Sequence, residues 1–494
     1  MSTTSAAASN MGRISVAERK LQLEREASGQ HLYANRIRVY PKAVHGIVRR
    51  IKWAVLIACL SIYYALPWLR WDRGPGRPTQ ALLLDIADRR FYLFDLVLWP
   101  EDIYYLTGLL ILGAVGLFLV TSLFGRVWCG YACPQTVWTD LFMWVERLLE
   151  GDRRERMRRD AQPMSVDSAW RKIAKHTIWL AIAFWTGGAW IMYYVDAPTA
   201  VRSFWSGAAS TEVYFFTFLF TFFTYLLAGW AREQVCTFMC PWPRFQSAMF
   251  DEQSFIVTYQ GWRGEKRGHV KAASTEKLGD CIDCGACVTA CPTGIDIRDG
   301  VQLECIGCGL CIDACNEVMA KVERKPWLIT WDSLARQSAK ALGTAGPIRL
   351  LRPRTLIYAT AMVLAVSVMG VALATRPTIG LSLQQDRAPL FVRLPDGSVR
   401  NGFTVKIANK TQVDAVFTLA LSGLPEGRLA LAETNAERSE TLRLNVTADQ
   451  VGSFRVLVFG KSHEKSEEMR FTLRNEATGE TTTYRAAFLG PGDR

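Results

Sequence analysis

The chain has 494 residues, of which 50% are hydrophobic and 21% are charged, and its formal net charge is +12. This composition excludes a uniform soluble globule, because long apolar runs alternate with strongly charged stretches. It predicts a membrane protein with soluble parts. The positive charge fits a basic rim facing anionic lipid, and we expect no binding to nucleic acid.

Five windows are apolar over the roughly 20 residues that a helix needs to cross a bilayer. These predicted spans are 53–71, 103–124, 177–195, 213–231 and 355–375. We therefore expect an α-helical transmembrane bundle with five spans.

The basic residues between the spans predict the topology. Lys and Arg number ten in residues 1–52, nine in 125–172 and sixteen in 232–354, against four in 72–102 and one in 196–212. Because basic loops stay in the cytoplasm, the N-terminus is predicted to be cytoplasmic and the C-terminus to lie across the membrane. The first residues lack the apolar core of a cleavable signal peptide and are interpreted as a cytoplasmic tail.

Two copies of Cys-x-x-x-Cys-Pro, each after the second helix of a pair, suggest an internal duplication. The first copy holds Cys129 and Cys133, and the second holds Cys236 and Cys240. Residues four apart share one face of a helix, and a following proline biases the preceding residue out of the helix. We therefore expect thiols at two helix ends.

Three arginines lie close in sequence to these thiols, namely Arg126, Arg232 and Arg244. If their side chains face the sulfurs, they favour the thiolate form. Four converging soft ligands suit Cu(I), and Met239 could add a thioether. The competing interpretation is that these cysteines are simply buried side chains.

The strongest signal is a pair of Cys-x2-Cys-x2-Cys-x3-Cys runs between Cys281 and Cys315. This is the spacing of a bacterial two-cluster ferredoxin, in which each run lends its fourth cysteine to the other 4Fe-4S cluster. Zinc is the weaker alternative, because its all-cysteine sites are usually built from separated pairs. We assign Cys281, Cys284, Cys287 and Cys315 to cluster one, and Cys305, Cys308, Cys311 and Cys291 to cluster two.

The C-terminal region lacks cysteine and contains about seven short alternating segments separated by turn signals. This pattern predicts an immunoglobulin-like β-sandwich outside the cytoplasm. The predicted domains are listed in chain order: a tail (1–52), four transmembrane helices with both cysteine motifs (53–250), a cytoplasmic ferredoxin domain (251–354), a fifth transmembrane helix (355–375) and a periplasmic β domain (378–494).

The motifs CGYACP and CTFMCP, the block CPTGIDIRDGVQLECIGCGLCIDACN and the cysteine-free C-terminal region resemble the cytochrome c oxidase accessory family called CcoG, FixG or RdxA. The resemblance covers nearly the whole chain. It implies a bacterial inner-membrane protein that acts in assembly of a cbb-type oxidase, where it reduces Cu(II) to Cu(I). It also implies that the four membrane cysteines bind copper or relay electrons.

We therefore predict a cupric reductase whose cofactors are two 4Fe-4S clusters and whose substrate is copper. The implied partners are membrane lipid, oxidase assembly factors or a copper chaperone, and an unknown cytoplasmic electron donor; self-association stays open. Two alternatives are an electron-transfer subunit of a quinone-linked reductase and a non-enzymatic assembly scaffold, since a fold alone does not assign a function.

Overall fold

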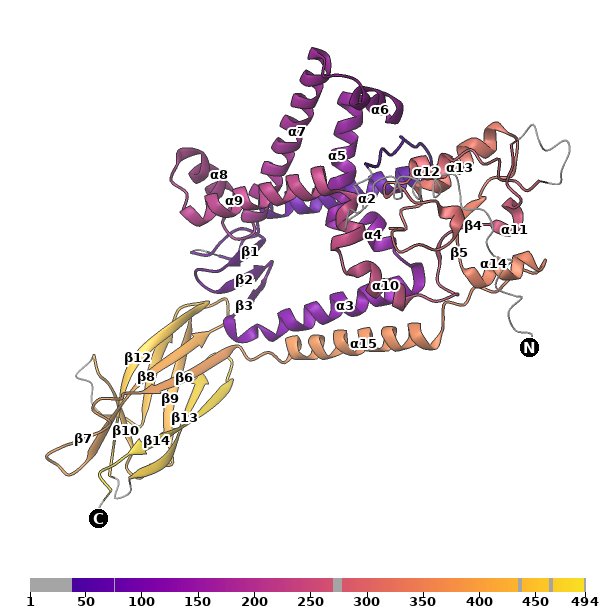
Figure 1. The fold of residues 1–494 in the computed structure, drawn as a ribbon. Helices are drawn as coiled ribbons and strands as arrows, with labels where there is room; N and C mark the ends of the chain where they lie inside the picture. Colours follow the sequence, from indigo (N-terminus) through magenta and orange to yellow (C-terminus); the bar gives the residue numbers. More distant parts are fainter. Residues whose placement is uncertain (1–37, 75, 270–277, 434–437, 462–464, 493–494) are drawn as a thin grey trace, which may run out of the picture. The chain divides into compact units, whose positions relative to one another are not determined.

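The computed structural model describes residues 38–74, 76–269, 278–433, 438–461 and 465–492. They form two compact units (Figure 1). The first contains residues up to 71 and 80–362, and the second contains 72–79 and 363–494. Most of the predicted N-terminal tail lies outside the described residues.

The helices of the membrane part lie in the first unit, except that the last of them, α15, begins in the first unit and ends in the second. They are α2 (Ile47–Ala65), α3 (Tyr104–Phe124), α4 (Val127–Tyr131), α5 (Pro134–Glu150), α6 (Arg153–Ala161), α7 (Val166–Ile191), α8 (Ala197–Ser206), α9 (Thr211–Thr224), the π-helical turns η3 (Tyr225–Ala231) and η4 (Val235–Met239), α10 (Trp242–Met249) and α15 (Pro353–Ala374). Because α2 begins at Ile47, the end of the predicted tail belongs to a helix.

Four helices among the described residues are long and apolar enough to cross a membrane. They are Ile47–Trp68, Pro100–Phe124, Thr211–Ala231 and Pro353–Ala374. The predicted third span falls on α7, which has 26 residues but is less apolar, because it begins with charged residues and continues with Trp, Gly and Thr. The count of five spans is therefore not confirmed.

A small antiparallel sheet between α2 and α3 was not predicted. Its strands are β1 (Leu82–Asp85), β2 (Arg90–Leu93) and β3 (Leu96–Leu98), in the order β1-β2-β3. The strands are only three or four residues long, so their alternation is too short to distinguish from a loop in the sequence.

The α5 helix carries buried carboxylates that join it to its neighbours. Asp140 pairs with Arg49 of α2 at 2.7 Å, and Glu146 pairs with Arg156 of α6 at 2.7 Å. Glu150 pairs with Lys175 of α7 at 2.7 Å. Arg156 belongs to the charged run of α6, where a solvated side chain would be expected, but it is 2% exposed because its partner Glu146 is also buried.

The cysteine-rich segment lies between two strands in the chain, β4 (Ile256–Tyr259) and β5 (Ile329–Asp332), which pair antiparallel. Its helices are α11 (Gly261–Gly264), α12 (Ala286–Ala290), the 3-10 turn η6 (Ile297–Asp299), α13 (Leu310–Lys321) and α14 (Leu334–Ala341). The short α12 and α13 each begin just after a glycine at positive φ, Gly285 and Gly309.

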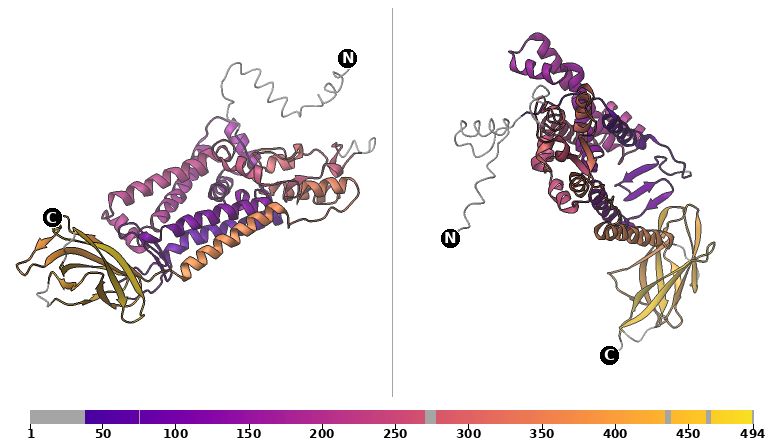
Figure 2. Two further views of the ribbon diagram at one scale, coloured as in Figure 1. Left: turned by 90° about the horizontal axis from the view of Figure 1, so that it is seen from below. Right: turned by 90° about the vertical axis from the view of Figure 1, so that its right-hand side faces the viewer.

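The second unit contains two antiparallel sheets that form a sandwich (Figure 2). Its strands are β6 (Ile379–Gln385), β7 (Val392–Arg393), β8 (Val399–Asn409), β9 (Ala415–Ser422), β10 (Arg428–Leu431), β11 (Thr441–Val446), β12 (Gln450–Gly460), β13 (Ser466–Asn475) and β14 (Thr481–Leu489). One sheet has the order β10-β12-β8-β6 with β7 beside β8, and the other has β11-β9-β13-β14. The described residues of this sandwich hold nine strands, where the sequence predicted about seven.

Alternation along the strands builds the core of this sandwich. Every second side chain of β8 from Val399 to Val405 is buried, and Phe417 of β9 and Phe471 of β13 are fully buried. The rings of Phe403 and Phe471, from opposite sheets, meet edge to face at 5.5 Å. The predicted sandwich is confirmed, because a period of two directs one face of each sheet inward.

Asp313 joins the cysteine-rich segment to the membrane part. Its carboxylate on α13 accepts hydrogen bonds from the backbone N–H groups of Val48 at 3.3 Å and Arg49 at 2.7 Å. These two groups belong to the first turn of α2, where N–H groups have no partner within the helix. The preceding Gly46 leaves room for this carboxylate, because a Cβ there would lie 2.2 Å from its Cγ.

We expect Asp313→Ala to lower the free energy of unfolding by about 0.5–2 kcal/mol, the usual cost of losing a helix cap. Thermal unfolding of the detergent-solubilised protein, followed by tryptophan fluorescence, measures the change. Glu317→Ala on the same helix is the control, because Glu317 forms an exposed pair with Lys321, and such pairs add little stability. Equal midpoints for both variants would exclude a capping role.

Candidate functional site

The first cysteine motif occupies a break between two helices. The α3 helix ends at Phe124, and Gly125 follows with φ 59°. Cys129 lies on the short α4, and Cys133 is extended, with φ −61° and ψ 128°, directly before Pro134 begins α5. The proline therefore acts as predicted: it holds Cys133 outside the helix.

The second motif follows the same plan with a different helical turn. Cys236 lies on η4, which is π-helical, and Cys240 is extended, with φ −80° and ψ 125°, before Pro241. The motif begins after Arg232, whose φ of 45° interrupts the helix. Wide turns of this type are frequent at functional sites.

Cys133 and Cys240 lie close enough to Cys129 and Cys236 to disfavour ionisation of the latter two thiols. Burial is the main cause that raises the pKa of Cys129 to about 11 and that of Cys236 to about 12. Cys133 and Cys240 raise both values further. The two motifs are therefore neighbours in space, although about a hundred residues separate them.

Of the three arginines, one acts on these two thiols in the predicted direction. Arg126 lowers the pKa of Cys129, but burial outweighs it. Arg232 instead pairs with Glu146 at 2.9 Å. The backbone carbonyl of Arg244 accepts a hydrogen bond from the hydroxyl of Ser247 at 2.7 Å.

No three His, Cys, Asp or Glu side chains among the described residues surround one point closely enough for a single metal ion. The four membrane cysteines are thus near one another but are not a ready tetrahedral site. Met239, the predicted thioether ligand, is 63% exposed. Copper binding by these five residues stays a prediction.

The cysteines assigned to cluster two line one cavity of about 20 Å³. They are Cys291, Cys305, Cys308 and Cys311. Cys287 also reaches this cavity, so the two quartets adjoin. Three cysteines of the second run and one of the first therefore meet here, as ligands of a two-cluster ferredoxin must.

The cysteines assigned to cluster one also come together. Cys281, Cys287 and Cys315 belong to one buried core, and the charge of the more exposed Cys284 acts on Cys287 and Cys315. In a 4Fe-4S cluster each cysteine binds a different iron atom, so the four sulfurs lie farther apart than they would around a single metal ion. This looser grouping of cysteines therefore fits the cofactor. Both quartets are therefore suited to 4Fe-4S clusters.

Asn316 follows the last ligand, where a ferredoxin usually has proline. Its side-chain oxygen accepts the backbone N–H of Trp327 at 2.7 Å. This bond connects α13 to the chain before β5 and gives the asparagine a structural role.

The first cysteine motif packs directly against residues 303–310, which carry Cys305 and Cys308 and are called the cluster-two loop below. Cys129 and Cys236 contact the buried group formed by Ile306, Cys308 and Leu310. The approach requires a glycine, because a Cβ at Gly130 would lie 2.8 Å from the Cα of Cys308. The membrane thiols are thus neighbours of a predicted cluster ligand.

Hydrogen bonds hold the same contact. The hydroxyl of Tyr131 donates to the carbonyl of Cys308 at 3.1 Å, and Arg126 donates to the carbonyl of Cys305 at 3.1 Å and to that of Leu303. The α4 helix is therefore fixed to both ends of the loop.

Gln246 is a site residue that the sequence did not reveal. It is fully buried on α10, and its Oε1 accepts the thiol of Cys129 at 3.1 Å. The hydroxyl of Thr136 donates to the carbonyl of Cys129 at 2.6 Å. Gln246 is 117 residues from Cys129, so no local pattern predicts this contact.

Three known families match this chain. A 4Fe-4S binding domain matches residues 106–151, a 4Fe-4S dicluster domain matches 231–334, and the IG-like fold at the C-terminal of FixG, putative oxidoreductase, matches 369–491. Each iron-sulfur match includes one of the two cysteine-proline motifs.

Among curated proteins, nitrogen fixation protein FixG of Rhizobium meliloti (strain 1021) is 44% identical over 493 residues, covering 93% of this chain and 94% of that protein. The chain belongs to the FixG/RdxA family. Protein RdxA of Cereibacter sphaeroides is 45% identical over 428 residues (86% of this chain, 90% of that protein). Protein RdxB of the same organism is 44% identical over 473 residues (94% and 98%). This FixG/RdxA member is thus a membrane protein with iron-sulfur domains for electron transfer.

We expect Gly130→Ala to separate α4 from the cluster-two loop and to lower iron content from about eight to about four per chain, as loss of one 4Fe-4S cluster requires. Iron analysis and visible absorbance measure this loss. Gly113→Ala is the control, since no atom lies within 4 Å of a Cβ there. Full iron content in Gly130→Ala would show that the loop tolerates the displacement.

We expect Cys129 and Cys236 to react with iodoacetamide at pH 7 at least about tenfold more slowly than an ordinary thiol, because a raised pKa leaves less thiolate. Their alkylation, followed by mass spectrometry on copper-free protein with intact clusters, should accelerate as pH rises toward 10. Cys129→Ser identifies the modified position. Rapid modification at pH 7 would contradict the assigned burial.

Proposed function

We propose that this protein reduces Cu(II) to Cu(I) for assembly of a cbb-type cytochrome c oxidase. The observation that carries the proposal is the contact of Cys129 and Cys236 with the cluster-two loop. Electrons cross protein rapidly only over short distances, so a thiol that packs against a cluster loop is a suitable place for an acceptor.

The chemistry of the four cysteines supports copper as that acceptor. Sulfur is a soft ligand that stabilises Cu(I) relative to Cu(II), so copper bound there is easier to reduce. Because burial keeps Cys129 and Cys236 protonated, metal binding must release their protons. The Oε1 of Gln246 accepts a hydrogen bond from the Cys129 thiol and thereby orients this side chain before the metal arrives.

The two cysteine quartets would hold 4Fe-4S clusters that supply one electron at a time, so oxidation of one reduced cluster would balance reduction of one Cu(II) to Cu(I). The protein's own part is to keep the copper ion near the cluster loop and away from bulk solvent. Arg126 and Tyr131 do this by fixing α4 to that loop.

We place the protein in the bacterial inner membrane, with its N-terminus and ferredoxin domain in the cytoplasm and its sandwich in the periplasm. The excess of Lys and Arg in residues 125–172 and 232–354 supports this orientation. An unidentified cytoplasmic donor would reduce the clusters. The sandwich is then available to oxidase assembly factors or to a copper chaperone.

The test uses protein whose clusters are chemically reduced and freed of excess reductant. With Cu(II) and a chelator that colours on binding Cu(I), the wild type should form about two Cu(I) per chain, one for each cluster. Cys129→Ser combined with Cys236→Ser should slow this reaction about tenfold or more, the scale on which changes around a metal site act. Cys59→Ser, at a cysteine away from both motifs, should react as the wild type.

Equal rates in wild type and the double variant, at equal iron content, would overturn the proposal. A parallel assay replaces Cu(II) with a soluble quinone and tests the quinone-linked alternative. If that alternative holds, quinone rather than Cu(II) should oxidise the clusters, and the double variant should slow this oxidation. Normal oxidase assembly in cells that carry a cluster-ligand variant would instead favour a scaffold.

A further inference from the structure

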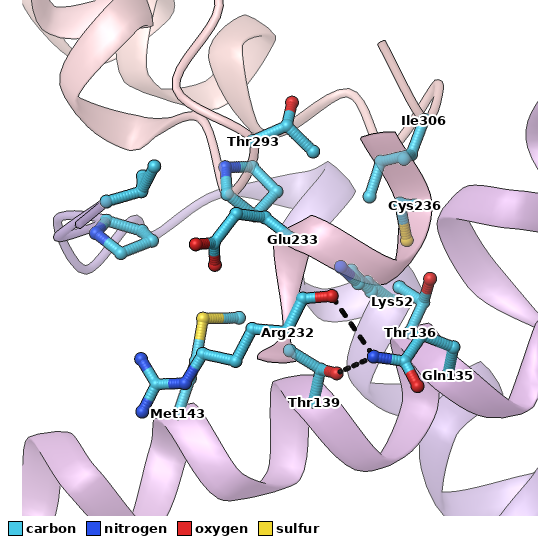
Figure 3. A pocket seen from close by; sticks show the side chains of 13 residues that line it. Lys52, Gln135, Thr136, Thr139, Met143, Arg232, Glu233, Cys236, Thr293 and Ile306 are labelled. Carbon is cyan, nitrogen blue, oxygen red and sulfur yellow. Dashed lines mark hydrogen bonds between the residues drawn. The ribbon is translucent and has the colours of Figure 1, made fainter. Parts of the chain in front are cut away.

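Lys52 is a buried cation beside the cluster-two loop. It lies on α2 and is 2% exposed, and its Nζ finds no hydrogen-bond partner within the described part of the chain. It lines a cavity of about 30 Å³ together with Ile306 and Thr293, which belong to the loops that carry the cluster-two cysteines (Figure 3). Cys236 lines the same cavity. This space holds one or two waters at most.

The charge of Lys52 is only partly balanced. Among the described residues, the carboxylate within 4 Å of its Nζ is that of Asp140, at 3.7 Å. The same carboxylate accepts two hydrogen bonds from Arg49, at 2.9 and 2.7 Å. Two cations thus share one anion, and the direct bonds go to Arg49.

The unbalanced charge lies beside the predicted cluster-two ligands. Ile306, which lines the same cavity as Lys52, lies between Cys305 and Cys308 in the chain. Arg126 is a second buried cation at this loop, and among the described residues no carboxylate lies within 4 Å of it. Both charges favour negative charge at the cluster-two cysteines.

The cations near cluster one are neutralised instead. Arg298 pairs with Asp296 at 2.6 Å and with Asp283 at 2.5 Å. Arg263 pairs with Asp280 at 2.6 Å. The two ferredoxin quartets therefore have similar ligands but different surrounding charge.

We propose that Lys52 stabilises the reduced form of cluster two and gives it a higher reduction potential than cluster one. Adding an electron makes a thiolate-bound cluster more negative, and a buried, partly unpaired ammonium group attracts that charge strongly because little water screens it. Electrons then move from cluster one to cluster two and collect beside Cys129 and Cys236. Lys52 is thus a positioning residue, and its role holds whichever acceptor follows.

The test is a redox titration of the full-length protein, followed by electron paramagnetic resonance. Wild type should show two reduction waves, and loss of one in Cys308→Ala identifies cluster two. Lys52→Met should shift the equilibrium between reduced and oxidised cluster two about tenfold or more toward the oxidised form. For a one-electron couple this lowers the reduction potential of cluster two by about 59 mV. The cluster-one wave should stay in place.

Two matched variants separate charge from structure. Lys52→Arg keeps the charge and should keep the wild-type potential, whereas Lys321→Met removes an exposed charge from the ligand helix α13 and should change neither wave. Asp140→Asn should move the cluster-two wave in the opposite direction, upward, because it removes the balancing anion.

The proposal is overturned if Lys52→Met leaves the cluster-two wave unchanged at full iron content, or if Lys52→Met and Lys52→Arg shift it equally. It is also overturned if the cluster-two wave lies below that of cluster one. None of these outcomes depends on copper reduction, so failure here and failure of the proposed function are distinguishable.

Discussion

The close approach of α4 to the cluster-two loop is the constraint on which the rest of this site depends. At Gly130 no side chain separates the helix from the backbone of Cys308, and Cys129 on the same helix reaches the buried group around that residue. A cluster held by the loop and a metal held by the membrane thiols would therefore be neighbours. Without this contact, the clusters and the four cysteines would be two unrelated sites.

Buried charge provides the second layer of organisation. The carboxylates of α5 gather cations from α2, α6 and α7, and a carboxylate on α13 holds the first turn of α2. Burying ions is costly unless each finds partners, so such a network specifies how the helices meet more than it adds stability. It also leaves a positive excess beside one cluster loop, where a thiolate-bound cluster adds negative charge.

Local patterns in the sequence predict the parts of this protein well. Cysteine spacing identifies both quartets, a following proline predicts the extended Cys133 and Cys240, and alternation predicts the sandwich. Features that arise from packing escape such patterns. Gln246 meets Cys129 only in the folded chain, and the thiol chemistry depends on burial, which the proximity of arginines in sequence does not report. The short β1–β3 sheet and the weakly apolar α7 carry too little periodicity or hydropathy for a secure assignment.

Electron paramagnetic resonance during stepwise addition of Cu(II) to fully reduced protein tests copper reduction most directly. We expect each added Cu(II) to stay silent, because it becomes Cu(I), while one reduced-cluster signal disappears for every copper ion until both clusters are oxidised. A Cu(II) signal that grows from the first addition while the clusters remain reduced would contradict it.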